Sequence, residues 1–166
     1  MPATLSCTLS KITTIPNKVN ADIISEYHQY MRDNGASERH QNNALKAVIG
    51  YTKFIGENTT FYDINAKKQM TAYLGTKIKS AEEDPDKKWI TTWNDKLHRI
   101  KHLFRWLYNQ RGKQVTIPVS NWERPAFAKI KEKNTKRLRS SAQRITSTEQ
   151  IFSNSSMFAN NNIYHR

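Results

Sequence analysis

Three residues of types found in phosphoryl-transfer enzymes occur in this chain, but their spacing does not assemble a catalytic site. His102 and Arg105 stand three residues apart, and an imidazole beside a guanidinium could transfer a proton and stabilise developing negative charge. Tyr164 could supply a nucleophile, but its surroundings offer nothing to hold it within reach of an activating group. A nucleolytic or strand-transfer enzyme is therefore one hypothesis. We expect instead that the spacing of His102 and Arg105 is fortuitous.

The other residues capable of chemistry do not predict a metal or cofactor site. Cys7 is the only cysteine, which excludes an internal disulfide framework and a cysteine-based zinc site. The five histidines are scattered, and no Ser-His-Asp spacing, paired carboxylate or glycine-rich phosphate loop is present. We therefore expect a protein that is not an enzyme and that uses no cofactor and no small-molecule substrate.

The charge balance indicates an acidic partner. The 166 residues include 27 Lys and Arg against 14 Asp and Glu, which gives a formal net charge of +13. Such an excess favours binding to nucleic acid. The mean hydropathy is −0.80, no run of 18 apolar residues occurs, and residues 1–10 lack the pattern of a secretory signal. We expect a cytoplasmic, nucleoid-associated protein with no membrane partner.

The positive charge gathers in two predicted helices and one linker. Residues 96–113 contain six Lys and Arg and no acidic residue. At 100° per residue, Arg99, His102, Arg105 and Trp106 lie away from the apolar stripe of this helix. A basic outer face suits a DNA groove, and a solvated surface is the alternative. The candidate DNA-binding residues are Arg39, Asn42, Asn43, Lys46, Lys96, Arg99, His102, Arg105, Lys131, Lys133, Lys136 and Arg137, whose types contact phosphates or base edges.

Apolar periodicity predicts four helices that form a compact, all-α bundle. Asn20 and Ser37 are expected N-caps, with stops at Gly35 and Gly56. The third helix starts near Asp63 or Asn65 and the fourth at Thr91 or Thr92, stopping near Gly112. The residues expected to be buried in the last two are Ile64, Met70, Tyr73, Leu74, Ile78, Trp93, Leu97, Ile100, Phe104 and Leu107. Residues 80–88 read as a solvated acidic loop.

These elements divide the chain into four segments. We expect a leader without periodicity over residues 1–19 and the helical domain over residues 20–112. Residues 113–139 form a connector with two prolines, followed by a basic linker. Residues 140–166 are rich in Ser and Asn, and we expect this tail to be disordered.

Several of these segments resemble one known family. In the second predicted helix, the residues on which the resemblance rests are Ser37, Ala44, Val48, Tyr51 and Phe54. In the fourth, they are Thr92-Trp93-Asn94, Ile100 and residues 103–109 (LFRWLYN). The segment after the helices adds Trp122-Glu123-x-Pro125 and residues 130–138 (IKEKNTKRL). Over residues 12–138 the chain resembles the N-terminal core-binding (SAM-like) domain of tyrosine recombinases, the phage-integrase family, and especially its archaeal members.

The resemblance implies a DNA-binding domain that grips duplex DNA through its second and fourth helices. In that family a separate C-terminal domain completes a clamp on the DNA and carries the catalytic tyrosine. Only 28 residues follow Leu138 here, so we expect the catalytic domain to be absent. We therefore expect a SAM-like bundle whose partner is double-stranded DNA in integration and recombination.

Two further hypotheses remain open. The chain could act as a regulatory fragment that competes with or joins a full-length integrase, for which an exposed Trp106 and the basic linker are the motivation. An RNA-binding module is compatible with the charge, but no recognisable RNA-binding motif accompanies it.

Overall fold

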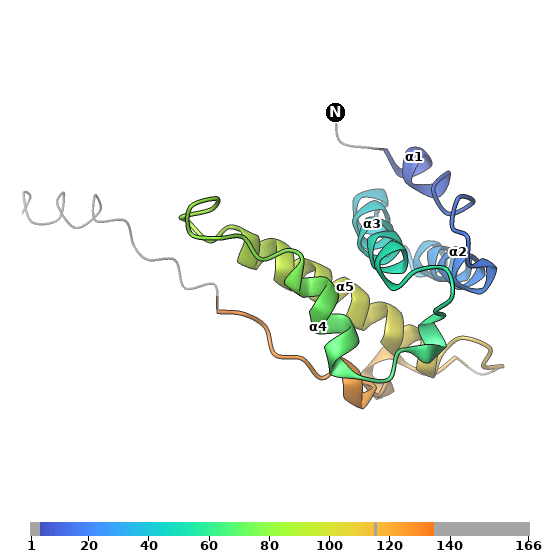
Figure 1. Ribbon diagram of the computed structural model, residues 1–166. Helices are drawn as coiled ribbons and strands as arrows, with labels where there is room; N and C mark the ends of the chain where they lie inside the picture. The colour runs from blue at the N-terminus through green and yellow to red at the C-terminus, as the bar shows by residue number, and fades with distance from the viewer. Residues whose placement is uncertain (1–3, 115, 135–166) are drawn as a thin grey trace, which may run out of the picture. The chain divides into compact units, whose positions relative to one another are not determined.

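The computed structural model describes residues 4–114 and 116–134, and all regular structure within these ranges is helical (Figure 1). In chain order the elements are α1 (Leu5–Leu9), α2 (Lys18–Asp33), α3 (Glu38–Ile55), η1 (Phe61–Asp63), α4 (Lys67–Gly75), α5 (Trp89–Asn109), η2 (Val119–Asn121) and η3 (Ala126–Ala128). The expectation of an all-α fold is confirmed for this part of the chain.

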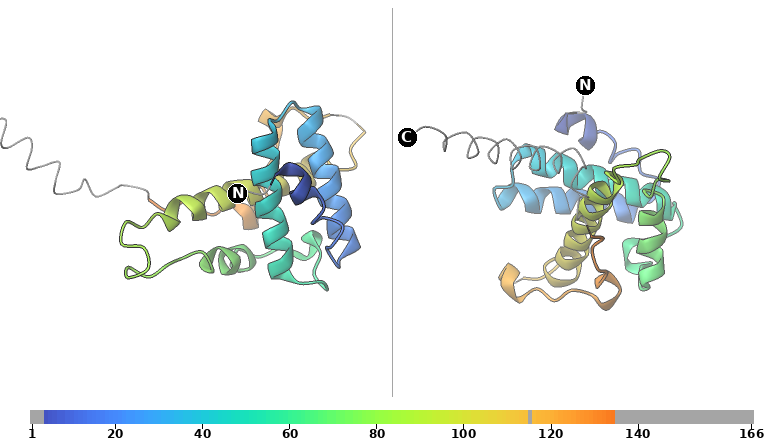
Figure 2. Two further views of the ribbon diagram at one scale, coloured as in Figure 1. Left: turned by 90° about the horizontal axis from the view of Figure 1, so that it is seen from above. Right: turned by 90° about the vertical axis from the view of Figure 1, so that its left-hand side faces the viewer.

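Helix α3 lies at the centre of the helical arrangement. It packs against α1, α2 and α5, and α5 also contacts α2 and α4. Figure 2 shows α2 and α3 side by side, with α5 crossing both. The apolar stripe predicted for α5 is buried, and Phe104 at its centre meets the rings of Tyr51, Phe61 and Phe127 at centroid distances of 6.3, 6.0 and 5.0 Å. Burial of this stripe supplies the main driving force for folding.

The expectation that residues 1–19 form a leader outside the helical domain is wrong for residues 4–17, because these residues belong to the packed structure. Helix α1 lies on α3, and the hydroxyl of the buried Thr8 donates a hydrogen bond of 2.6 Å to Oδ1 of Asn42. Ile12 and Ile15 are also buried in the core. A single turn of helix is too short to show periodicity, so the sequence pattern missed it.

The first long helix begins earlier than expected. Asn17, not Asn20, caps α2, and its side chain accepts a hydrogen bond from the Asn20 amide. Asn20 is fully buried, donates to the Thr59 carbonyl at 2.8 Å and accepts from the Phe61 amide at 2.9 Å. Its side chain therefore links α2 to the segment that leads into η1.

The other end signals of α2 and α3 are confirmed. Gly35 has φ +70°, and the amides of Gly35 and Ala36 donate to the carbonyls of Arg32 and Met31, each at 2.9 Å. This is a Schellman motif, which needs a residue in the left-handed region. Ser37 caps α3 and Gly56 ends it.

The third and fourth predicted helices differ from the structure at their ends. Ile64 is buried but precedes α4, and Ile78 lies beyond it and is 48% exposed. Helix α5 begins at Trp89, whose amide donates to the Asp84 carboxylate at 2.7 Å. The acidic loop before it is largely exposed, as predicted.

The connector packs onto the helices and forms one compact unit with them, so residues 113–134 are not separate from the helical domain. Trp122, Phe127 and Ala128 are buried. Lys136, Arg137 and the predicted disordered tail lie outside the described residues. Within the described ranges, no helix has both the length and the apolarity that a bilayer requires.

Candidate nucleic-acid interface

A cleft of about 310 Å³ opens between α2, α3, α5 and the connector. We call it the basic cleft, and its lining residues are Tyr27, His40, Ala44, Asp95, His98, Arg99, Lys101, His102, Arg105 and Arg124. The structure thus brings together three residues predicted for DNA binding, Arg99, His102 and Arg105. It adds four basic side chains that the prediction missed, those of His40, His98, Lys101 and Arg124.

Arg99 meets a carboxylate at the edge of the cleft. Its Nε and Nη2 atoms donate to the two carboxylate oxygens of Asp95 at 2.8 and 2.6 Å. Asp95 precedes the acid-free stretch by one residue, and spacing of i to i+4 places the two side chains on one helical face. Much of the positive charge of Arg99 is therefore offset within its own helix.

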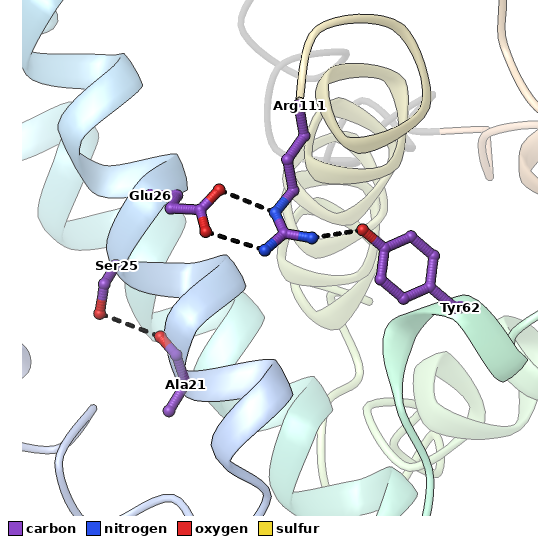
Figure 3. Close-up of polar contacts among 5 residues, drawn as sticks. All are labelled: Ala21, Ser25, Glu26, Tyr62 and Arg111. Carbon is purple, nitrogen blue, oxygen red and sulfur yellow. Dashed lines mark hydrogen bonds and ion pairs between the residues drawn. The ribbon is translucent and has the colours of Figure 1, made fainter. Parts of the chain in front are cut away.

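A second arginine of the acid-free stretch is paired with a distant helix. Arg111 donates two hydrogen bonds of 2.8 Å to the carboxylate of Glu26 on α2, and a third to the hydroxyl of Tyr62 (Figure 3). Bidentate pairing of this kind is among the stronger polar contacts in proteins. Two arginines of residues 96–113 are therefore paired with carboxylates in the folded chain, so this stretch carries less uncompensated positive charge than its sequence suggests.

Arg105 holds the connector while keeping its charge. Its Nη2 donates to the carbonyl oxygens of Val119 and Trp122 at 3.3 and 3.1 Å. These acceptors are neutral, so the guanidinium still contributes a positive potential to the cleft.

His102 is anchored by the helix that packs against it. Its Nδ1 atom lies 2.7 Å from the Tyr27 hydroxyl. Burial holds the pKa of His102 below its usual range, and the neighbouring His40 and Arg105 lower it further. Burial also raises the pKa of Tyr27, which stays protonated. At neutral pH the pair is therefore uncharged.

Trp106 is buried, so the prediction of an outward-facing indole is wrong. It is 3% exposed, and its ring lies 5.2 Å from that of Tyr27 and 5.8 Å from that of Tyr30. Helix α2 covers this side of α5. A helix crossed by several neighbours is buried over more than one stripe, which a single apolar periodicity does not reveal.

The two lysines of α5 are both withdrawn from solvent, Lys101 more than Lys96. Lys101, which the prediction omitted, donates from Nζ to the Ile130 carbonyl. Its pKa is lowered by burial and by Arg124. Lys96 is half-buried and does not line the cleft. Its pKa is lowered by burial and by Lys77.

The predicted residues of α3 do not line the cleft. Arg39 is exposed in the first turn, whereas Asn42, Asn43 and Lys46 are half-buried. Asn42 faces α1, where it accepts the hydrogen bond from Thr8. His40 is the basic residue that α3 contributes to the cleft.

The linker residues within the described range differ in their surroundings. Lys131 is exposed. Lys133 is half-buried, and its ammonium nitrogen lies 5.3 and 5.2 Å from the ring centres of Trp89 and Trp93, which is the range of cation–π contact. The start of the basic linker is therefore held on α5.

Polar side chains along α5 fix the connector through its backbone. Asn94 donates to the Lys133 carbonyl and accepts from the Lys133 amide, and Asn109 does the same with Glu123. Asn94, Lys101, Arg105 and Asn109 are spaced by 7, 4 and 4 residues, so they share one face of the helix. That spacing is the sequence signal by which this face could have been recognised.

Within the described residues, no group of three or more His, Cys, Asp or Glu side chains could hold a metal ion.

Comparison with protein-family models, with curated proteins and with solved structures gives no match.

Proposed function

We propose that this chain binds duplex DNA through the basic cleft and does not itself cut it. The supporting observation is the composition of the cleft, where seven basic or histidine side chains from α3, α5 and the connector meet a single carboxylate, that of Asp95. Arg99 already pairs with that carboxylate. The charge of Arg105 and Arg124 is left to attract phosphates, and each phosphate neutralised releases counterions.

The finer proposal is a SAM-like core-binding domain of the tyrosine-recombinase family. In this interpretation the N-terminal part of α3 and the middle of α5 face the DNA backbone, flanked by the exposed Arg39. The connector runs along α5, where Asn94, Arg105 and Asn109 bond its backbone, and would lead toward a catalytic domain in a complete recombinase.

The contacts of His102 and Arg105 argue against a catalytic pair. His102 is held by Tyr27, and Arg105 donates to two connector carbonyls. Both side chains therefore have structural partners that account for their types. The regulatory alternative loses one of its motivations, because Trp106 is buried and offers no exposed anchor for a full-length integrase.

Fluorescence anisotropy with a labelled duplex across a salt series tests the proposal. If about 5–6 phosphates are neutralised, the logarithm of the affinity falls with the logarithm of salt at a slope near −5. A chain ending at Leu138 retains binding if the helices and linker carry it. Affinity that stays equal at low and high salt refutes the proposal.

Matched variants locate the contact. Arg124 lines the cleft and is exposed, so Arg124→Gln removes one charge and reduces the magnitude of the salt slope by about 1. Lys68 is exposed on α4 and does not line the cleft. Lys68→Gln removes the same charge, and we expect it to leave the slope unchanged. Equal effects of the two variants would show that net charge, not the cleft, binds DNA.

A further inference from the structure

We propose that His40 and His102 together bind a backbone phosphate of DNA and that His102 takes up a proton in the complex, which makes DNA binding tighten as the pH falls. The inference rests on the proposed DNA-binding function and assigns the chemistry of one contact within the same cleft. The two imidazoles come from different helices, α3 and α5, and both line the cleft.

One nitrogen of the His102 ring is already held by α2. The hydroxyl of Tyr27 lies 2.7 Å from Nδ1, which fixes the ring and leaves Nε2 as the nitrogen that can donate to a phosphate oxygen. His40 is exposed in the first turn of α3. The positive end of the helix dipole there favours a nearby anion.

Among the described residues that line the cleft, Asp95 is the one carboxylate, and it is already paired. Tyr27 of α2 is neutral, Lys101 and Arg105 of α5 and Arg124 of the connector are basic, and the carboxylate of Asp95 is held by Arg99. His98 lies in the same cleft, but Glu132 sits 3.0 Å from its Nε2. Because His98 already has an acidic partner, His40 and His102 are the imidazoles that gain most from a bound phosphate.

Proton uptake follows from electrostatics. Burial is the main cause of the lowered pKa of His102, and the neighbouring His40 and Arg105 lower it further. A negative phosphate bound beside His102 favours the protonated imidazole, so the pKa of His102 rises in the complex. Linkage then requires that DNA bind more tightly at a pH where His102 is protonated. A DNA phosphodiester keeps one negative charge from pH 7.5 to 5.5, so the protein supplies the titrating groups.

The test is duplex affinity of the full chain at pH 7.5 and 5.5, at one fixed salt concentration. A rise of about one unit in the pKa of a single histidine on binding corresponds to a gain in affinity of up to about tenfold, reached at a pH below both the free and the bound pKa. We expect such a gain for the unmodified chain and its loss when His40→Gln and His102→Gln are combined. His28→Gln is the matched control, because His28 pairs with Gln41 outside the cleft, and it should keep the full gain.

Two further measurements keep the inference independent of folding defects. His40→Gln alone changes an exposed side chain, and we expect it to reduce the pH effect while the thermal unfolding midpoint stays unchanged. The NMR titration of the His102 imidazole should move to higher pH when duplex is added.

Three results would overturn the inference. Salt-sensitive DNA binding without pH dependence refutes it but leaves the proposed function intact. A pH effect that persists in the double variant also refutes it. Absence of DNA binding at both pH values refutes the proposed function and this inference together.

Discussion

The hydroxyl oxygen of Tyr73 lies 2.9 Å from the position that a Cβ atom on Gly50 would occupy. Gly50 lies within α3, where glycine is an unfavourable helix residue. The Tyr73 ring is buried against Tyr51 and Phe54, at centroid distances of 5.2 and 5.5 Å. The close approach of the Tyr73 hydroxyl to α3 therefore depends on the missing side chain.

Substituting Gly50→Ala is expected to lower the free energy of unfolding by about 1–2 kcal/mol, because overpacking outweighs the better helix propensity of alanine. In a Tyr73→Phe background the obstructing oxygen is gone, and the same substitution should stabilise the protein by up to about 1 kcal/mol. Urea unfolding of the four proteins in this cycle measures the coupling. Equal effects of Gly50→Ala in both backgrounds would contradict the contact.

Two residues of α5 are expected to differ strongly in their contribution to the stability of the fold. Phe104 is fully buried, and Phe104→Ala is expected to cost about 3–5 kcal/mol of unfolding free energy. Arg99 pairs with the exposed Asp95, so Arg99→Ala should cost less than about 1 kcal/mol. Thermal unfolding of both variants checks the orientation of the helix. A loss for Arg99→Ala as large as that for Phe104→Ala would show that the orientation is wrong.

The lowered pKa of His102 predicts a loss of stability in mild acid. Below the ordinary histidine pKa of 6.5 the unfolded chain binds the proton while the folded chain resists it, so the free energy of unfolding falls as the pH drops. Urea midpoints at pH 7 and pH 5 measure this fall, which His102→Gln should reduce. His28→Gln serves as the control. A pH dependence unchanged by His102→Gln would mean that other groups cause it.

Removing the amide of Asn94 should release the end of the connector. Its two hydrogen bonds to Lys133 are each 2.9 Å long, and each contributes about 1 kcal/mol. In Asn94→Ala we expect faster hydrogen exchange at the Lys133 amide and faster tryptic cleavage after Lys131. Exchange at amides in the middle of α3 is the internal control. An unchanged rate at Lys133 would show that the hydrogen bonds to Asn94 do not hold this segment.

Much of the helical framework could be predicted from the sequence, because the signals involved are local. The apolar stripe of α5, the cap at Ser37 and the glycine stops at Gly35 and Gly56 depend on residues within one or two turns. The acid-free stretch likewise directed attention to Arg99, His102 and Arg105, which the basic cleft brings together.

The tertiary structure decided which of these side chains have partners. Trp106 is buried because α2 crosses α5, and Arg111 is paired with Glu26, which lies 85 residues away in the chain. His40 enters the cleft and Lys133 is held between two indoles for the same reason. Periodicity specifies the direction of a side chain relative to its own helix axis, but it contains no information about the neighbouring segments. Those segments meet only when the chain folds, and they determine which charges remain for a ligand.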